Sequence, residues 1–259
     1  MLRSLKELLG YTIRATDGEL GKVRDFFFDD KVWTIRYLAA DTGGWLSGRQ
    51  VLLSPQSFGK PDWSNKIVPV NLTREAIEHS PPIESDQPIS RQYESMMAAH
   101  YGWAPYWGME GTPLVQPPEV IESLPSTEDQ ARSDPNLRSM RDTIHLTLHA
   151  TDGDAGRVHD FIVQSDDWVI RYMVADIGHL LSGKKVLVSP AWIRDVDWTE
   201  RAVYVDLEQS AIREGPPFDY ETPVNREYEV RLYDFYGRPV YWEGELPELT
   251  TTIKDVEEK

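Results

Sequence analysis

The residues best suited to chemistry are three histidines in the second half of the chain. His145 and His149 are separated by three residues, and in a β-strand this spacing turns both imidazoles to one face. His159 on the next predicted strand, with Asp142 or Asp152 nearby, would complete the ligands of a divalent metal ion. The alternative is an exposed hairpin face that binds no metal.

Two arginines at corresponding places in the sequence suggest internal ion pairs rather than catalysis. Arg36 and Arg171 lie between apolar residues, and Asp41 and Asp176 follow them five residues later. A half-buried guanidinium stabilises a carboxylate through paired hydrogen bonds. A catalytic carboxylate needs a positioned acid–base partner, and the sequence contains no GxSxG, HExxH or phosphate-loop motif. We therefore expect neither enzyme activity nor a cofactor.

Aromatic side chains gather near the end of each half, and in the first half two methionines precede them. Large aromatic residues anchor protein interfaces, and methionine adapts to partners of varied shape. The residues expected to bind a partner are Trp103, Met96, Met97, Tyr106, Trp107, Tyr241 and Trp242. In the alternative, Tyr101, Tyr106 and Trp107 hold the helical tail onto its own barrel or onto the other copy. Trp103 is the most informative of the set, because Arg238 occupies the corresponding position.

Composition limits the classes of protein to which the chain can belong. Of its 259 residues, 40% are hydrophobic and 27% are charged, as in a soluble globular protein. The net charge of -16 disfavours nucleic acid as a partner, because phosphate binding needs local positive charge. The chain has no cysteine, and its apolar runs fall far short of the roughly 20 residues of a membrane helix. We expect a cytoplasmic protein without membrane insertion.

The chain repeats itself at an offset of 135 residues. The most similar stretches are Ala15-Thr16-Asp17-Gly18 with Ala150-Thr151-Asp152-Gly153, Asp25-Phe26 with Asp160-Phe161, Ile35-Arg36-Tyr37 with Ile170-Arg171-Tyr172, and Tyr106-Trp107 with Tyr241-Trp242. Residues 1–108 contain 12 basic and 13 acidic side chains, whereas residues 139–243 contain 11 and 19. The sequence therefore predicts two copies of one module whose surfaces have diverged.

Each copy is expected to form short strands followed by a helical tail. In the first copy the strands are predicted at 11–15, 22–28, 33–41, 50–53 and 67–72, where strand-forming residues alternate between glycine and proline punctuation. Thr73 and Ser90 are expected to cap two short helices. The predicted fold class is mainly β, with two tandem small β-barrels, each followed by a short helical tail.

The domain boundaries follow from the repeat and from composition. The first copy spans 1–108, a proline-rich acidic linker spans 109–138, the second copy spans 139–245 and an acidic tail spans 246–259. A linker of this length permits either separated barrels or a packed pair. The sequence alone leaves both arrangements open.

Five stretches of the first copy form a recognisable set: Leu9-Gly10-Tyr11, Ala15 to Val23, Asp25-Phe26, Trp33 to Leu38 and Val51 to Pro55. Together they resemble the PRC-barrel family, named after the cytoplasmic domain of the photosynthetic reaction-centre H subunit. The resemblance covers residues 5–80 and extends to residues 144–215 of the second copy. It implies a pair of small all-β barrels used for docking or assembly.

Two functions from different classes remain open. The first is a non-enzymatic binding or assembly module for an unidentified protein, in which two linked barrels bind a two-site target or replace a homodimer. Self-association or packing of the two barrels within one chain is compatible with this function. The alternative is a receptor for a small molecule or metal, with its site between the barrels.

Overall fold

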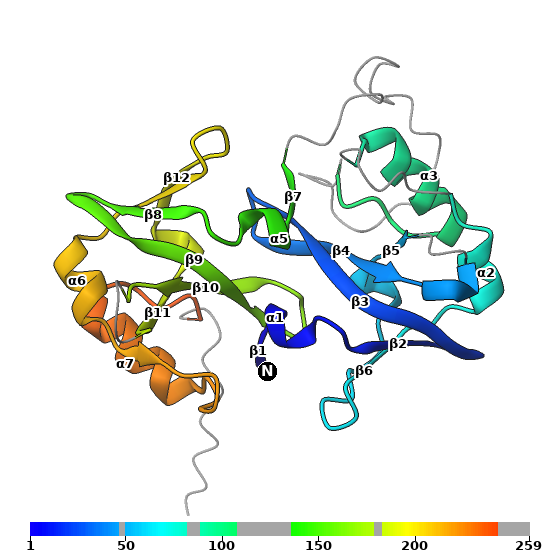
Figure 1. Cartoon of the computed structure of the whole chain (residues 1–259), viewed down its shortest axis with the longest axis horizontal. Coiled ribbons are helices and arrows are strands. Elements are labelled where there is room, and N and C mark those ends of the chain that lie inside the picture. The colour runs from blue at the N-terminus through cyan, green and yellow to red at the C-terminus, as the bar shows by residue number, and fades with distance from the viewer. Residues whose placement is uncertain (47–49, 82–88, 108–135, 179–182, 243–259) are drawn as a thin grey trace, which may run out of the picture.

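The fold is mainly β, as predicted, and is built from two sheets. A computed structural model describes residues 1–46, 50–81, 89–107, 136–178 and 183–242. The predicted acidic tail and nearly all of the predicted linker lie outside the described residues. We call residues 1–107 the first half and residues 136–242 the second half. The halves lie side by side, with α2 and α3 at one end of the molecule and α6 and α7 at the other (Figure 1).

The two halves contain corresponding elements in nearly the same order. The first half contains β1 (Leu2–Ser4), α1 (Leu5–Leu8), β2 (Thr12–Ala15), β3 (Gly18–Asp29), β4 (Thr34–Asp41), β5 (Gln50–Leu53), β6 (Ile67–Pro69), α2 (Arg74–Glu78) and α3 (Arg91–Tyr101), with 3-10 turns at Gly43–Leu46 and Pro55–Ser57. The second half contains β7 (Leu137–Ser139), α5 (Met140–Thr143), β8 (Thr147–Ala150), β9 (Gly153–Gln164), β10 (Ile170–Asp176), β11 (Lys185–Val188), a 3-10 turn (Pro190–Trp192), β12 (Ile193–Asp197), β13 (Ala202–Val205), α6 (Gln209–Glu214), β14 (Pro217–Phe218) and α7 (Arg226–Tyr236).

Each sheet is centred on a long, curved strand. In the first half the order is β5-β4-β3-β2-β6, and in the second it is β12-β13-β8-β9-β10-β11-β14. β2 pairs with β6 and β8 with β13 in parallel, and the other pairs are antiparallel. Among the described residues neither sheet returns to its first strand, so the hydrogen bonds there do not close a barrel.

The strands of the first half follow the sequence pattern but differ from it at their ends. The predicted strand over 22–28 spans Gly18–Asp29, and the predicted strand over 11–15 begins at Thr12. The predicted strand over 33–41 begins one residue later, because Trp33 has a left-handed backbone (φ 52°) that ends the preceding turn. The predicted strand over 67–72 ends at Pro69, whose nitrogen has no hydrogen to donate to a sheet. Gly21 is required for close packing, since a β-carbon there would lie 2.0 Å from the carbonyl oxygen of Asp41.

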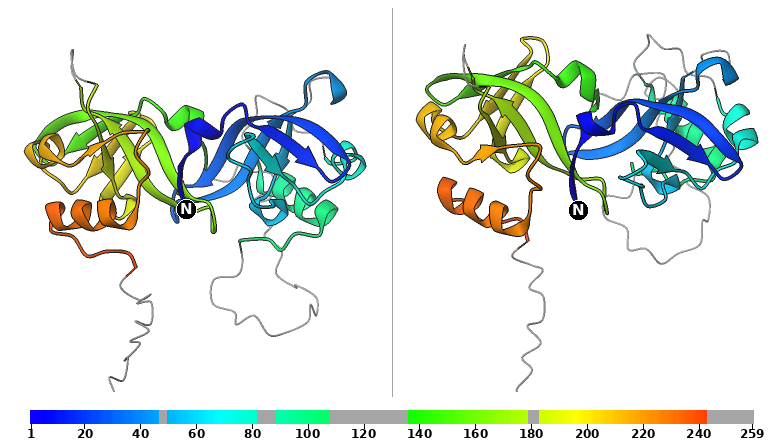
Figure 2. Two further views of the ribbon diagram at one scale, coloured as in Figure 1. Left: turned by 90° about the horizontal axis from the view of Figure 1, so that it is seen from below. Right: turned by 60° about the horizontal axis from the view of Figure 1, so that its bottom comes forward.

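The halves exchange their first strands. β1 of the first half pairs with β9 of the second, and β7 of the second half pairs with β3 of the first. We call residues 1–9 and 136–144 the arms. They lie between the two sheets in all three ribbon views (Figures 1 and 2). Each half therefore lends its first strand and short helix to the other, and β7 places Leu137 and Arg138 in the second half rather than in the linker.

The halves also share one hydrophobic core. Phe28 of the first half contacts Phe161 of the second, with ring centroids 5.4 Å apart. The backbones meet in a reciprocal pair of hydrogen bonds, from Ile35 N to the Trp168 carbonyl (2.9 Å) and from Ile170 N to the Trp33 carbonyl (2.7 Å). The two modules are consequently a packed pair rather than separate units joined by a linker.

Candidate functional site

Each arm is anchored by a buried aspartate of the opposite half. On β9, Asp160 accepts hydrogen bonds from Ser4 Oγ (2.5 Å) and Lys6 N (3.0 Å) of the first arm. Phe161 N (2.7 Å) and the Tyr220 hydroxyl (3.0 Å) donate to the same carboxylate. Asp160 is fully buried, so its burial is compensated by four donors, two of which come from the exchanged arm.

The equivalent anchor on β3 is Asp25. It accepts hydrogen bonds from Ser139 Oγ (2.5 Å) and Arg141 N (3.3 Å) of the second arm, and from Phe26 N (2.8 Å). Ser4 and Ser139 also cap the first turns of α1 and α5. One serine therefore both begins the arm helix and attaches it to the other half, which explains why Asp25 and Asp160 occur at corresponding positions.

Burial makes the stability of this pair of anchors depend on pH. It raises the pKa of Asp25 and of Asp160 above the usual 3.8, although the hydrogen bonds oppose the shift. A folded-state pKa above the unfolded value means that this contribution is complete below pH 3.8 and is lost as pH rises through the folded-state pKa. Relative to an Asp25→Asn/Asp160→Asn variant, the native chain should lose free energy of unfolding as pH rises above about 4 and through the raised pKa values of the two carboxyl groups.

Urea unfolding at a series of pH values measures this difference. Asp234→Asn provides an exposed control, and its unfolding free energy should run parallel to that of the native chain. Parallel curves for the double variant as well would contradict the predicted contribution of the buried carboxylates.

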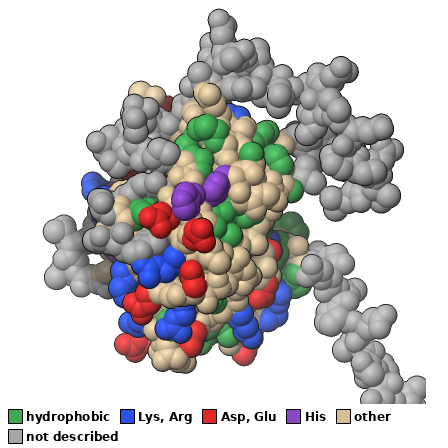
Figure 3. All heavy atoms as spheres, turned by 90° about the vertical axis from the view of Figure 1, so that its right-hand side faces the viewer, with side chains coloured by type: hydrophobic (Ala, Val, Ile, Leu, Met, Phe, Trp, Pro, Cys, Tyr) green, Lys and Arg blue, Asp and Glu red, His purple; other side chains and the backbone are tan. Residues whose placement is uncertain are grey.

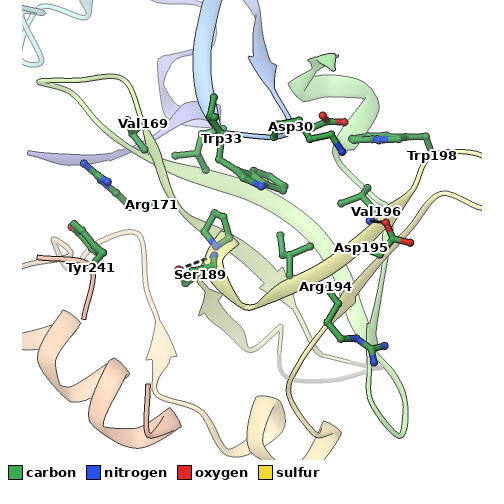
Figure 4. Close-up of a pocket in the computed structure, with 16 residues that line it drawn as sticks. Asp30, Trp33, Val169, Arg171, Ser189, Arg194, Asp195, Val196, Trp198 and Tyr241 are labelled. Carbon is green, nitrogen blue, oxygen red and sulfur yellow. Dashed lines mark hydrogen bonds between the residues drawn. The ribbon is translucent and has the colours of Figure 1, made fainter. Parts of the chain in front are cut away.

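Two clefts at the junction of the halves correspond to each other. The first, which we call the Trp33 cleft, has a volume of about 500 Å³. Its lining comes from both halves: Asp30, Lys31, Val32 and Trp33 from the first, and Val169, Ile170, Arg171, Ser189, Pro190, Ala191, Ile193, Arg194, Asp195, Val196, Trp198 and Tyr241 from the second. Figure 4 shows Trp33 projecting toward β12, with Trp198 at one end of the cleft and Tyr241 at the other.

The second cleft, the Trp168 cleft, lies at the corresponding place with the roles of the halves reversed. It has a volume of about 550 Å³ and is lined by Met1, Pro55, Phe58, Gly59, Lys60, Pro61, Trp63, Ser165, Asp166 and Trp168. The exchanged arms reach both clefts in the same way. The Arg138 guanidinium lies 4.3 Å from the Trp198 ring centroid, and that of Arg3 lies 4.8 Å from the ring centroid of Trp63.

The two clefts share two pairs of tryptophans and one pair of prolines and differ at other lining positions. The shared pairs are Trp33 with Trp168, Trp198 with Trp63, and Pro190 with Pro55. The divergent pairs are Asp30 with Ser165, Lys31 with Asp166, Arg194 with Gly59, Asp195 with Lys60, and Val196 with Pro61. The repeat therefore provides one cleft design twice, with different chemistry at the rims.

The aromatic ends of both halves are held by buried glutamates. Glu229 accepts hydrogen bonds from the Tyr172 and Tyr241 hydroxyls, each at 2.8 Å, and Arg226 lies 3.3 Å from it. Burial, together with the nearby Glu229, raises the pKa of Tyr241. In the first half, the Tyr106 hydroxyl donates to Glu94 at 2.6 Å.

The predicted partner-binding residues have mainly internal contacts. Tyr106 and Tyr241 bind the buried glutamates, and the guanidinium groups of Arg91 and Arg226 lie over Trp107 and Trp242. Met97 is buried, Met96 is exposed, and Trp103 stacks on Tyr101 with centroids 4.2 Å apart. The arrangement matches the alternative in which these residues hold each end in place. Tyr241 additionally lines the Trp33 cleft.

Removing the buried glutamate should be costly. Glu229→Ala leaves two buried hydroxyls without their acceptor, and we expect a loss of about 2–4 kcal/mol in unfolding free energy. Glu229→Gln keeps one side-chain oxygen and should lose less. Glu227→Ala, on the exposed side of α7, is the control. Equal stability of Glu229→Ala and Glu227→Ala in urea would contradict this role.

The two arginines of the predicted ion pairs do form ion pairs, but with other aspartates than those predicted. The pairs observed are Arg36 with Asp29 (3.2 Å) and Arg171 with Asp167 (2.5 Å). Asp41 and Asp176 accept hydrogen bonds from backbone amides two residues later. A spacing of five residues places side chains on opposite faces of a strand, so the pairing predicted from sequence is wrong.

The three histidines predicted to bind a metal, His145, His149 and His159, do not form a cluster in the structure. His145 lies outside β8 in a left-handed conformation (φ 75°), so it does not share a strand face with His149. His149 Nδ1 lies 2.7 Å from Asp154, and His159 Nε2 lies 3.4 Å from Lys6 Nζ. Burial and the charge of Lys6 lower the pKa of His159. No set of three or more His, Cys, Asp or Glu side chains among the described residues is arranged to hold a metal ion.

Two histidines of the first half have a structural role that sequence reasoning missed. His79 Nδ1 lies 2.8 Å from the Glu75 carbonyl, and His100 Nε2 on α3 lies 2.7 Å from the Ala76 carbonyl on α2. Figure 3 shows histidine side chains together on this end of the molecule, beside acidic groups. His100 links the two helices, and their spacing in sequence gave no signal of this contact.

Comparison with known proteins identifies part of the first half. Residues 2–73 match the model of the PRC-barrel domain. The match runs from β1 of the first arm to Thr73, the residue that caps α2. No curated protein matches the chain. None of the described helices has the length and apolar character needed to cross a membrane.

Proposed function

We propose that this chain is a non-enzymatic, cytoplasmic protein-binding or assembly module made of two PRC-barrel copies. The observation that supports it most is the pair of corresponding aromatic clefts at the junction of the halves. Clefts rich in tryptophan and tyrosine are typical of sites where proteins dock. The match of residues 2–73 to the PRC-barrel domain supports the same class of function.

The proposed second copy rests on the repeat. Its elements follow those of the first half in nearly the same order, and Asp160, Trp168 and Trp198 occupy the places of Asp25, Trp33 and Trp63. Because each copy completes the other through its arm, the pair takes the place of a homodimer of single barrels. Divergence of the cleft rims then allows one chain to present two different docking sites.

The charges also favour a protein partner over nucleic acid. The chain carries a net charge of -16, which opposes association with a phosphate backbone. The buried carboxylates Asp25, Asp160, Glu94 and Glu229 are all occupied by hydrogen bonds that hold the fold. Their engagement in structural contacts supports the proposal that the chain is not an enzyme.

A small-molecule receptor is the second candidate, and the location of the clefts between the halves favours it. A volume of about 500 Å³ falls within the range of ligand sites. In this case, a small molecule should remain with the chain through gentle purification, and its removal should lower the thermal midpoint.

Native mass spectrometry on tagged chain, isolated gently from its own host, distinguishes the two functions. The proposal predicts a second protein at fixed stoichiometry. A small organic mass on the 29.7 kDa chain would favour the receptor instead. The bare chain alone would contradict both functions under the conditions used.

A further inference from the structure

We propose that the Trp33 cleft binds an extended segment of a partner protein in which acidic side chains flank a large apolar residue. This inference rests on the proposed binding function and adds the chemistry of the partner. The first observation in favour of an extended segment is the elongated shape of the cleft. Figure 4 shows Arg171 and Tyr241 at one end, Asp30 and Trp198 at the other, and Trp33 between them.

An edge strand borders the cleft along its length. Four successive residues of β12, from Ile193 to Val196, line the cleft. The pairing of β12 with β13 shifts register between Ile193 and Asp195, and this irregularity interrupts the alternation of side chains, so residues of both strand faces reach the cleft. Among the described residues β12 pairs only with β13. Val196 N donates to the side chain of Asp195, and the remaining backbone groups of the other edge can receive an extended peptide as an added strand.

The middle of the cleft suits a large apolar side chain. Trp33 lines it together with Pro190, Ile193 and Val196. The ring of Trp33 is held from behind by Phe28, with centroids 5.4 Å apart. A wall that is already ordered reduces the entropy lost when a partner residue is buried against it.

The charges of the rims favour acidic side chains on both sides of that residue. Lys31 and Arg194 are exposed, and neither takes part in a salt bridge among the described residues. The acidic groups are already engaged: Asp30 Oδ2 lies 2.9 Å from Arg138 Nε, and Asp195 Oδ1 accepts a hydrogen bond from Val196 N. Lys31 and Arg194 lie on opposite halves, so they suit separated carboxylates of one extended segment rather than a single compact anion.

Asp30 contributes a further recognition group at one end of the cleft. Its side chain is only 6% exposed, and its Oδ1 atom has no hydrogen-bond donor among the described residues. A buried acceptor without a donor carries an unfavourable desolvation cost. A backbone N–H of a bound segment would satisfy this oxygen.

The Trp168 cleft lacks these features and provides a natural control. Gly59 and Pro61 replace Arg194 and Val196, and isolated bridges from Phe58 to Val70 and from Asp62 to Ile67 take the place of the continuous strand β12. Ser165 and Asp166 replace Asp30 and Lys31. The same pair of tryptophans is therefore present without the edge strand, the buried acceptor and the two cations.

The test uses an acetylated, amidated seven-residue peptide of alternating glutamate and apolar residues, with phenylalanine at the centre. Its binding to the full chain is measured by titration calorimetry, beside an analogue with lysine in place of glutamate. We expect the lysine analogue to bind at least about tenfold more weakly. Lys31→Asp/Arg194→Gly, which copies the other cleft, should weaken the acidic peptide by about tenfold, whereas Lys60→Glu in the Trp168 cleft should not.

Peptide methylation tests strand addition without altering the protein. Alternate amides of an extended peptide point to opposite edges, so N-methylation of one alternate set should abolish binding and methylation of the other should preserve it. Equal binding of both methylated peptides would overturn the inference. Failure of the acidic peptide to bind at about 1 mM, or equal effects of the variants in both clefts, would also overturn it.

These outcomes are separate from the test of the proposed function. A chain that retains a protein partner in native mass spectrometry, but does not bind the acidic peptide, would overturn only the assignment of this cleft. A chain that retains no protein would contradict the proposed function. The peptide titration would still show whether the Trp33 cleft binds an acidic segment.

Discussion

Replacing Asp160 with alanine is expected to lower the free energy of unfolding by about 3–4 kcal/mol. The substitution removes the acceptor of the Ser4 hydroxyl, the Tyr220 hydroxyl and two backbone amides, one of which belongs to the first arm. These donors are then left in a site where the native carboxylate is fully buried. Urea unfolding followed by tryptophan fluorescence measures the loss.

Two further variants make this result specific to the exchanged arms. Asp25→Ala should lose less than Asp160→Ala, because Asp25 is 8% exposed and three donors bind it. Asp234→Ala is exposed and should change stability by no more than about 0.5 kcal/mol. A loss below about 1 kcal/mol in both anchor variants would show that the aspartates do not hold the arms.

Cutting the chain between its halves should leave them bound to each other. A protease site introduced within residues 109–135 allows the intact, folded chain to be cleaved after purification. The exchanged arms and the shared core join residues 1–107 to residues 136–242 independently of that segment. The two fragments should therefore elute together from a sizing column at micromolar concentration and separate only in denaturant.

Elution of two separate fragments under native conditions would contradict this prediction. The same cleavage in an Asp25→Ala/Asp160→Ala chain is the informative comparison, because both anchors are then absent. That chain should release its fragments at a lower urea concentration than the otherwise native one. Equal urea concentrations would mean that the shared core alone determines the association.

The hairpins of each half could be predicted from the sequence, because the residues that indicate them lie close together in the chain. Alternating residues and glycine turns lie within a few positions of one another in β2 to β5. Thr73 and Ser90 cap α2 and α3 as predicted, each accepting a hydrogen bond from an amide three residues later. Such contacts depend on neighbours in sequence, so a pattern of a few residues is sufficient to predict them.

The exchange of the arms could not be predicted from the sequence in the same way. β1 and β7 are three residues long, too short to show a period. Their partners are far away in sequence, as in the pairing of Ser4 with Ile162. The repeat did align Asp25 with Asp160, but only the fold shows that each binds the arm of the other half.

The clefts were partly visible in the sequence. The repeat aligns Trp63 with Trp198 and Trp33 with Trp168, yet each cleft combines one residue of each pair from opposite halves. The sequence alone does not show that the halves pack against each other reciprocally, so the matched tryptophans suggest two separate hydrophobic cores. The sequence instead favours binding residues at the aromatic ends of the halves, whose tyrosines form hydrogen bonds with buried glutamates in the structure.

Docking of the partner at the junction of the halves can be tested by locating the surface that the partner covers. Hydrogen exchange should be measured on the full chain alone and in its complex with the protein isolated from its host. Protection is expected in residues 29–34 and 189–198 around the Trp33 cleft, with residues 55–63 and 165–168 protected if a second site is occupied. Protection confined to α2, α3 or α7, with both clefts unchanged, would contradict docking at the junction.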